Sequence, residues 1–270
     1  MNALPAFFRN MYHHRYLIAQ MTRREISQRY RGSALSLAWA ILNPLVMLAI
    51  YTFVFSVVFK ARWGSGDAEE SRAAFAITLF AGMIVFNLFA EIINRAPSLI
   101  LSNVNFVKKV IFPLEILPLV SIGVVLFHSF ISLLVLLAAQ LVFNRYIPFT
   151  IIYLPLIILP LLLVGLGASW ILSSLTVYIR DITQITGVIT TLLMFTSAVF
   201  FPIESLPEEY HAAMRLNPVA MIITESRNAL IFGQTPDWGW LGVMMLIGLG
   251  IAAGGYWWFQ KTRKGFADVL

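Results

Sequence analysis

Six long stretches without a charged residue limit what this chain can fold into. They cover residues 32–59, 73–90, 116–144, 146–179, 182–203 and 238–260, and the shortest has 18 residues and the longest 34. A helix of about 20 apolar residues crosses the hydrocarbon core of a bilayer, whereas a charged side chain at its centre costs roughly 2.5–3.5 kcal/mol. The sequence therefore predicts an all-α integral membrane protein with six transmembrane helices.

The composition points to the same class of protein. Hydrophobic residues make up 59% of the chain and charged residues 12%, and a soluble protein carries about twice that share of charge. This excludes most soluble enzymes, and we expect no nucleic-acid partner despite the net charge of +6. Because the chain has no cysteine, disulfides and cysteine-ligated metal centres are excluded as well.

The distribution of basic residues predicts the orientation in the membrane. With six spans, 13 of the 19 Lys and Arg residues fall on the side of the two termini. Basic residues accumulate in cytoplasmic loops, so both termini are predicted to be cytoplasmic. We expect a cytoplasmic N-terminus with an amphipathic helix at residues 1–33, a membrane domain at 34–260 and a cytoplasmic C-terminal tail at 261–270.

The segment that precedes the first span, residues 16–33, mixes apolar and basic residues. This composition is typical of an amphipathic helix that lies in the membrane interface. One interpretation is a basic anchor held by anionic lipids. The other is a helix that responds to a cytoplasmic partner and transmits movement into the first span.

The connection between the second and third spans, residues 95–113, is long. Helix–helix connections usually have about 2–8 residues, whereas this one has 19. Ser102 and Asn103 can start a helix, Lys108 and Lys109 form a basic pair, and Pro113 ends the segment. We expect a short amphipathic helix that projects into the cytoplasm, and the alternative is a positively charged topological stop.

The last long connection, residues 202–237, is expected outside the membrane on the opposite side. Its apolar stretches at 219–224 and 229–232 are too short to cross a bilayer. Irregular backbone near the membrane persists only where protein buries it or water solvates it. A cap or a short re-entrant hairpin is therefore predicted here.

The sequence shows little catalytic chemistry. It has no phosphate-binding loop of the G-x-x-x-x-G-K-[ST] kind, so we expect no ATP bound through such a loop. Glu91 and Glu115 fall near the ends of predicted spans, and His128 is the ionisable residue deepest within one. A lone histidine there is more typical of helix packing than of a ligand, and we predict no catalytic residues and no metal site.

Aromatic and hydroxyl side chains follow two of the spans. In the first span, mostly aromatic and polar residues recur every four positions: Trp39, Asn43, Met47, Tyr51, Phe55 and Phe59. In the fifth span, hydroxyl residues fall at near-helical spacing: Thr183, Thr186, Thr190 and Ser197. Such faces can stack on sugar rings and bind their hydroxyls. They also pack helices together, and on physical grounds alone packing is the simpler interpretation.

Four motifs together resemble a known family. QRYRGSALSLAWAILNPL (28–45), NFVKKVIFPLEILPL (105–119), YIRDITQI (178–185) and FPIESLPEEYHAAMRLNP (201–218) are similar, in the same order, to permease subunits of bacterial ABC exporters. The most similar branch, often called Wzm-like, exports O-antigen, capsular and teichoic acid polymers. Ala198 departs from the pattern, because the family often has proline there.

The resemblance implies a homodimer in the bacterial inner membrane that works with separate cytoplasmic ATPase subunits, which bind ATP and Mg, while this chain holds no cofactor. It implies export of a lipid-linked polysaccharide of the O-antigen type from the cytoplasm to the periplasm. The alternative is an ABC permease for a capsular polymer, a teichoic acid, a drug or a small lipid, and a stand-alone channel or membrane enzyme is a more distant one. Carried over by motif, it assigns a gate helix (Arg29, Tyr30, Arg31, Gly32), a coupling segment that contacts the ATPase (Asn103, Phe106, Lys108, Lys109) and a channel lining (Trp39, Asn43, Tyr51, Phe55, Phe59, Thr190, Ser197).

Overall fold

A computed structural model describes residues 11–30, 38–54, 68–108 and 112–270. Within these ranges the chain forms helices and no strands, as the sequence predicts. The longer helices are α2 (Arg15–Tyr30), α3 (Ala38–Tyr51), α4 (Ala68–Arg95), α7 (Leu117–Phe143), α8 (Leu154–Tyr178), α9 (Ile182–Thr196), α10 (Glu208–Leu216), α11 (Pro218–Arg227) and α12 (Trp238–Thr262). Short helices and turns connect them: α5 (Ser98–Leu101), α6 (Val104–Lys108), η2 (Leu114–Ile116), η3 (Phe149–Tyr153), η4 (Ile203–Ser205), η5 (Asn228–Phe232), η6 (Arg263–Gly265) and α13 (Phe266–Val269).

Four of the helical stretches are long and apolar enough to cross a membrane. They are Ala74–Arg95, Leu114–Phe143, Phe149–Tyr178 and Trp238–Val269. Two further apolar helices, Ala38–Val54 and Ile182–Thr196, are shorter than 18 residues. These six stretches fall within or overlap the six charge-free runs, and four of them have the length of a full span.

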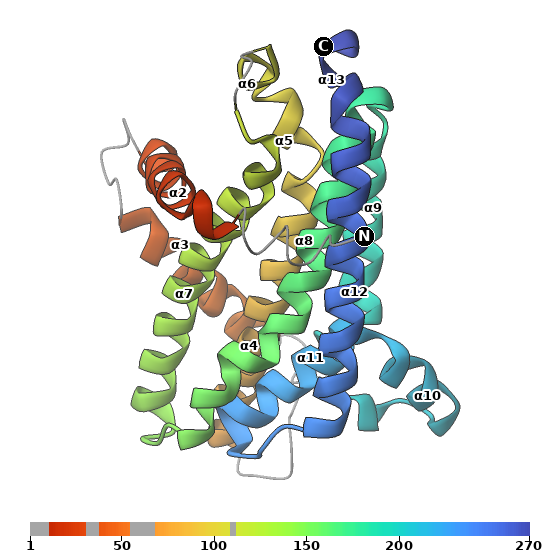
Figure 1. Ribbon diagram of the computed structural model, residues 1–270. Coiled ribbons are helices and arrows are strands. Elements are labelled where there is room, and N and C mark those ends of the chain that lie inside the picture. The colour runs from red at the N-terminus through yellow and green to blue at the C-terminus, as the bar shows by residue number, and fades with distance from the viewer. Residues whose placement is uncertain (1–10, 31–37, 55–67, 109–111) are drawn as a thin grey trace.

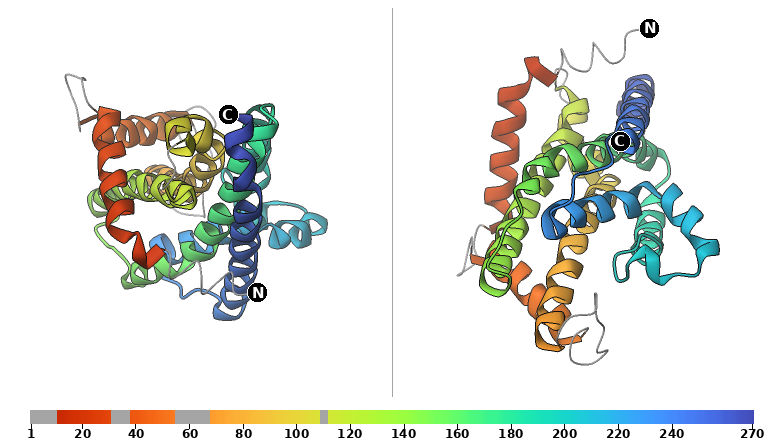
Figure 2. Two further views of the ribbon diagram at one scale, coloured as in Figure 1. Left: turned by 45° about the horizontal axis from the view of Figure 1, so that its top comes forward. Right: turned by 90° about the horizontal axis from the view of Figure 1, so that it is seen from below.

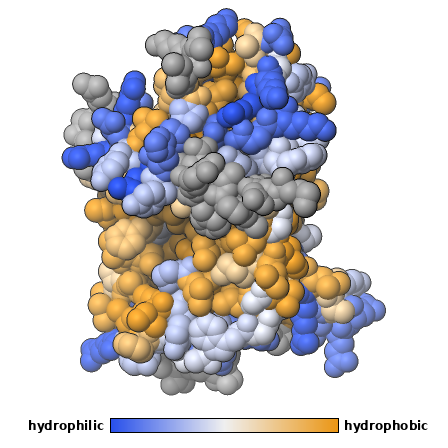
Figure 3. Space-filling view, in the orientation of Figure 1, coloured by the Kyte–Doolittle hydropathy of each residue, from blue (hydrophilic) through white to orange (hydrophobic). Residues whose placement is uncertain are grey.

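Polar side chains gather at the two ends of the bundle (Figure 3). One end carries α5, α6 and α13, and we call it the α6 end (Figure 1). The opposite end carries α10 and α11, and we call it the α11 end. The apolar band between the two ends is the surface expected of a protein whose solvent is lipid.

Helix α4 forms the centre of the bundle. Of its apolar stretch, 89% is buried inside the protein, against 22–28% for the other three long stretches. It packs against α3, α7, α8, α9 and α11. Other helices therefore enclose most of α4, whereas its Asn87 and Asn94 are exposed.

Helices α8 and α12 form the most extensively packed pair. Gly255 lies against the backbone of Gly167, and a methyl group added at Gly248 would lie 3.0 Å from the carbonyl oxygen of Pro160. Small residues at such positions let two helix backbones approach closely, which is the usual way that helices associate in membranes. The pair therefore forms a stiff wall along one side of the molecule.

The segment at 202–237 folds into short helices, and α11 turns back to pack against α4 and α8. Asn217 caps α11, since its Oδ1 accepts hydrogen bonds from the backbone amides of Val219 and Ala220 at 3.0 and 3.4 Å. A capping side chain of this kind satisfies amide groups that have no partner inside the helix. Within this segment α11 packs onto the bundle, whereas α10 packs against α11 and η4.

Candidate functional site

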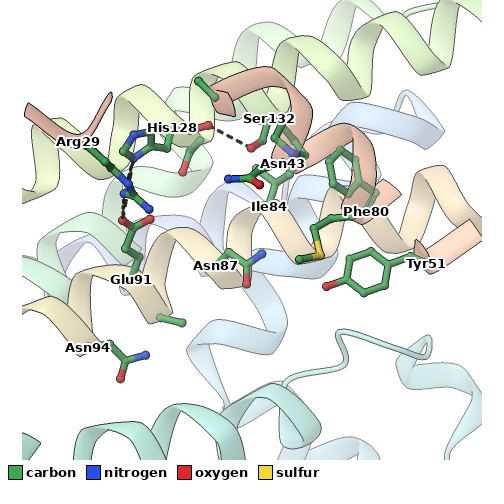
Figure 4. Close-up of a pocket in the computed structure, with 15 residues that line it drawn as sticks. Arg29, Asn43, Tyr51, Phe80, Ile84, Asn87, Glu91, Asn94, His128 and Ser132 are labelled. Carbon is green, nitrogen blue, oxygen red and sulfur yellow. Dashed lines mark hydrogen bonds and ion pairs between the residues drawn. The ribbon is translucent and has the colours of Figure 1, made fainter. Parts of the chain in front are cut away.

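A polar cavity of about 540 Å³ lies between α2, α3, α4 and α7. Figure 4 shows its side chains, which come from all four helices. Seven of the fifteen lining residues are uncharged hydrogen-bonding groups, six are apolar, and an arginine and a glutamate lie at one side. The polar lining residues are Arg29, Asn43, Tyr51, Asn87, Glu91, Asn94, His128, Ser129 and Ser132.

Helical spacing explains why these side chains face one cavity. On α4, Asn87, Glu91 and Asn94 are four and three positions apart, which places them on one face of the helix. On α3, Asn43 and Tyr51 lie on the face that repeats every four residues. This part of the polar and aromatic pattern seen in the sequence is therefore a cavity wall.

A network of charged side chains closes the cavity on the side of α2. Arg29 Nη1 donates to Glu91 Oε1 at 3.0 Å and lies 3.2 Å from His128 Nδ1. Arg95 Nη1 lies 3.4 Å from the same glutamate oxygen and also pairs with Glu25. Two residues of α2 are thus tied to α4, and one of them also to α7.

The charged network is partly open to solvent. The side chain of Arg29 is 50% exposed and that of Glu91 is 30% exposed. Ion pairs in such surroundings contribute roughly 0–1 kcal/mol each, because water competes for both partners. The network can therefore hold α2 in a defined position without fixing it there irreversibly.

Helix α2 rests on protein through one face. Its half-buried residues are Leu17, Ile18, Met21, Thr22, Glu25 and Ile26, which repeat as one stripe along a helix. This helix packs against α7, and Figure 2 shows it lying across the outside of the bundle. At the contact Gly123 faces Thr22, and a methyl group added to the glycine would lie 2.9 Å from the Thr22 hydroxyl.

The predicted gate residues are only partly described. Arg29 belongs to the charged network, and Tyr30 is the last residue of α2. Arg31 and Gly32 lie outside the described residues. The gate assignment therefore depends, within the described part of the chain, on Arg29.

The predicted coupling segment contains two short helices, α5 and α6, where the sequence predicted one. Ser102 Oγ donates to the carbonyl of Ser98 at 2.6 Å, and Asn103 Nδ2 donates to that of Leu99 at 2.9 Å. Side chains that bind nearby backbone compete with the helix and interrupt it. As predicted, a helix begins directly after Asn103.

Two of the remaining coupling residues, Phe106 and Lys108, lie on α6. The ring of Phe106 stacks on that of Phe112, with the ring centroids 4.2 Å apart. Lys108 is exposed. Lys109 lies outside the described residues.

The predicted channel residues do not share one surface. Asn43 and Tyr51 line the cavity, whereas Trp39 is 43% exposed at the surface. Thr190 is buried and donates to Asn94 Oδ1 at 3.1 Å, which joins α9 to α4. Ser197 is also buried, and its hydroxyl accepts from Asn217 Nδ2 at 3.1 Å. These two hydroxyls join helical segments in the structure, and their assignment to a channel stays a prediction. Phe55 and Phe59 lie outside the described residues.

Sequence reasoning missed the most deeply buried arginine. Arg227 is 3% exposed, and its guanidinium donates to three backbone carbonyls: Thr78 at 3.0 Å, Ala198 at 2.7 Å and Val199 at 2.5 Å. The guanidinium lies against Gly82, where a side chain would collide with it. The available signal was an arginine placed between two apolar stretches.

Comparison with known proteins agrees with this architecture. The family described as ABC-2 type transporter matches residues 16–231. The chain is 24% identical over 264 residues to the O-antigen export system permease protein RfbA of Myxococcus xanthus, covering 97% of this chain and 98% of that protein. It is 22% identical over 255 residues to the protein of the same name from Klebsiella pneumoniae, covering 94% and 95%. It is also 22% identical over 215 residues to the polysialic acid transport protein KpsM of Escherichia coli, covering 79% and 81%. Since the family match spans well over half of its length, this chain belongs to the ABC-2 type transporter family.

Proposed function

We propose that this chain is the membrane-spanning permease subunit of an ATP-driven exporter that moves a lipid-linked polysaccharide from the cytoplasm to the periplasm. The observation that carries the proposal is the polar cavity between α2, α3, α4 and α7, together with the charged network beside it. Relatives matched over nearly their whole length are named for O-antigen export. In this proposal the protein sits in the bacterial inner membrane with six spans, and α3 and α9 supply the two spans that are shorter in the described residues.

The side chains in the cavity suit a substrate rich in hydroxyl groups. The amides of Asn43, Asn87 and Asn94 each carry both donor and acceptor groups. The hydroxyl of Ser132 donates to the backbone carbonyl of His128 at 3.1 Å and keeps its acceptor capacity. Tyr51 adds an aromatic face on which a sugar ring can stack. These groups can bind the hydroxyls of a sugar polymer, and the two charged lining residues, Arg29 and Glu91, pair with each other.

The energy source in this proposal is a separate pair of ATPase subunits, which bind ATP and Mg²⁺. They dock at the α6 end, which faces the cytoplasm by the distribution of basic residues. Two copies of this chain form the permease, and the polymer passes between or beside them. Movement of α6 changes the position of α2, whose ion pairs to α4 are weak enough to break and re-form.

The experiment that tests the proposal is deletion of the gene in its natural host. Lipid-linked polymer is then extracted from the cytoplasmic fraction, and the polymer at the cell surface is measured in parallel. We expect the polymer to accumulate inside and to be lost from the surface, with both effects reversed by the intact gene. Normal surface polymer with no internal pool would contradict polysaccharide export and favour a smaller exported substrate.

A further inference from the structure

The last residues of the chain form a folded segment that lies at the α6 end (Figure 1). We call residues 262–270 the terminal segment; it contains η6 and α13. Its Phe266 is fully buried, with its ring centroid 5.6 Å from that of Phe259 and 6.2 Å from that of Tyr178. Helix α13 packs against both α6 and α8. The terminal segment therefore lies between the coupling segment (residues 95–113) and the stiff α8–α12 pair.

A second contact joins the terminal segment to the chain that leads from α6 into α7. Arg263 Nη1 lies 2.8 Å from Glu115 Oε2. Glu115 is buried on η2, and its backbone carbonyl accepts a hydrogen bond from Trp170 Nε1 at 3.0 Å. The terminal segment thus contacts η2, directly after the coupling segment, as well as α6.

The path of the terminal segment is fixed by Tyr178, the last residue of α8. Its hydroxyl donates to the carbonyl of Thr262 at 3.2 Å. A methyl group added at Gly265 would lie 2.8 Å from the same hydroxyl, so the backbone passes directly beside the tyrosine. A polar contact, an ion pair and a buried ring together give this short segment a defined position.

We propose that the terminal segment is a brace that positions the coupling segment against the α8–α12 pair, with Phe266 and Arg263 as its positioning residues. The proposal rests on the proposed function, because it takes residues 95–113 as the contact with the ATPase. Helix α6 has five residues and is too short to hold its own orientation. With α13 packed beside it, a push on α6 reaches α8 and α12 as well as α4 and α7.

The test uses the full chain assembled with its ATPase partner in membranes. Three variants disturb or restore the brace: Phe266→Ala, Arg263→Glu, and Arg263→Glu combined with Glu115→Arg. The matched control is Lys264→Glu, which makes the same charge change at an exposed neighbour. Because the chain has no cysteine, spin labels at Asn105→Cys and Asp268→Cys report the distance between α6 and α13.

We expect Phe266→Ala and Arg263→Glu to broaden the distance distribution and to lower the amount of polymer exported per ATP hydrolysed by roughly three- to tenfold. The charge-swapped double variant should recover much of the narrow distance distribution and of the polymer exported per ATP. Lys264→Glu should change neither of these two quantities. An unchanged distance and an unchanged ratio in both single variants would overturn the brace. A broadened distance with a normal ratio would also overturn it as a positioning device for transport. If a Lys108→Glu variant also exported polymer normally, the assignment of residues 95–113 as the contact with the ATPase would be wrong.

Discussion

Two arginines in different parts of the molecule hold helices together in different ways. Arg29 joins α2 to α4 and α7, and half of its side chain is exposed. Arg227 joins α11 to α4 and to the residues that follow α9, and it is 3% exposed. The first contacts a carboxylate and an imidazole, whereas the guanidinium of the second donates to three backbone carbonyls.

This difference separates a contact that can change from one that cannot. Water and neighbouring charges can replace the partners of Arg29, so its ion pair contributes little and exchanges readily. Removing Arg227 would leave three buried carbonyls without these donors, and each such loss costs about 1–3 kcal/mol. The α11 end is therefore expected to be fixed, and the position of α2 adjustable.

The largest effect is expected for Arg227→Met. The substitution keeps an apolar stem of similar length but removes every donor, so we expect a loss of roughly 3 kcal/mol or more of folding free energy. Thermal unfolding in detergent measures it. Arg215→Met, at an exposed arginine on α10, is the control and should stay within about 0.5 kcal/mol. Equal stability of the two variants would remove the distinction between the arginines.

The next effect tests the space that Arg227 occupies. Gly82→Ala places a methyl group where the guanidinium lies. Because the guanidinium or the backbone must shift, the free energy of unfolding should fall by about 1–3 kcal/mol. The control is Gly250→Ala, because nothing lies within 4 Å of a methyl group added there. Thermal unfolding in detergent compares the stability of the two variants. A Gly82 variant as stable as the Gly250 variant would mean that the guanidinium is not tightly held.

A smaller stability effect, but a clear functional one, is expected for Arg29→Ala. Loss of an exposed ion pair should change the unfolding free energy by less than about 1 kcal/mol, while export and the position of α2 change. The amount of surface polymer measures export, and a spin label on α2 measures the position of that helix. Arg23→Ala, at an exposed arginine of the same helix, is the control. Normal export in the Arg29 variant would exclude the charged network from gating.

The smallest effect concerns Ala198, which has a φ of 53°. Residues with a side chain rarely adopt this left-handed conformation, whereas glycine does so easily. Ala198→Gly should therefore raise the unfolding free energy by about 0.5–1 kcal/mol. Ala212→Gly, at an exposed position inside α10, should lower it by a similar amount. The opposite order would contradict the backbone conformation described here.

The conformation of Ala198 also explains a departure noted in the sequence. The exporter family that the sequence resembles often has proline at this position, and proline is restricted to φ near −65°. A backbone at 53° excludes proline here. Arg227 holds this turn through the carbonyls of Ala198 and Val199, so the two unusual features belong to one arrangement.

The sequence predicted the helical segments better than their contacts. The charge-free runs predicted where the apolar helices lie, and the helix directly after Asn103 was expected. The break between α5 and α6 was not, because it depends on side chains that bind the preceding turn. Of the predicted channel residues, Asn43 and Tyr51 line the cavity, but nothing in the spacing of Thr190 distinguishes a cavity wall from a helix contact.

By itself the sequence determined the solvent of this protein, the helices that it forms in that solvent and the family to which it belongs. These follow from local quantities, namely the length of apolar runs and the order of short motifs. Only the tertiary structure decided which polar residues meet. Arg29 and Glu91 are 62 positions apart, and Arg227 and Thr78 are 149 apart. The packed helices bring such residues together, and at Arg227 the burial of the guanidinium also requires that it find partners. No local pattern in the chain records that geometry.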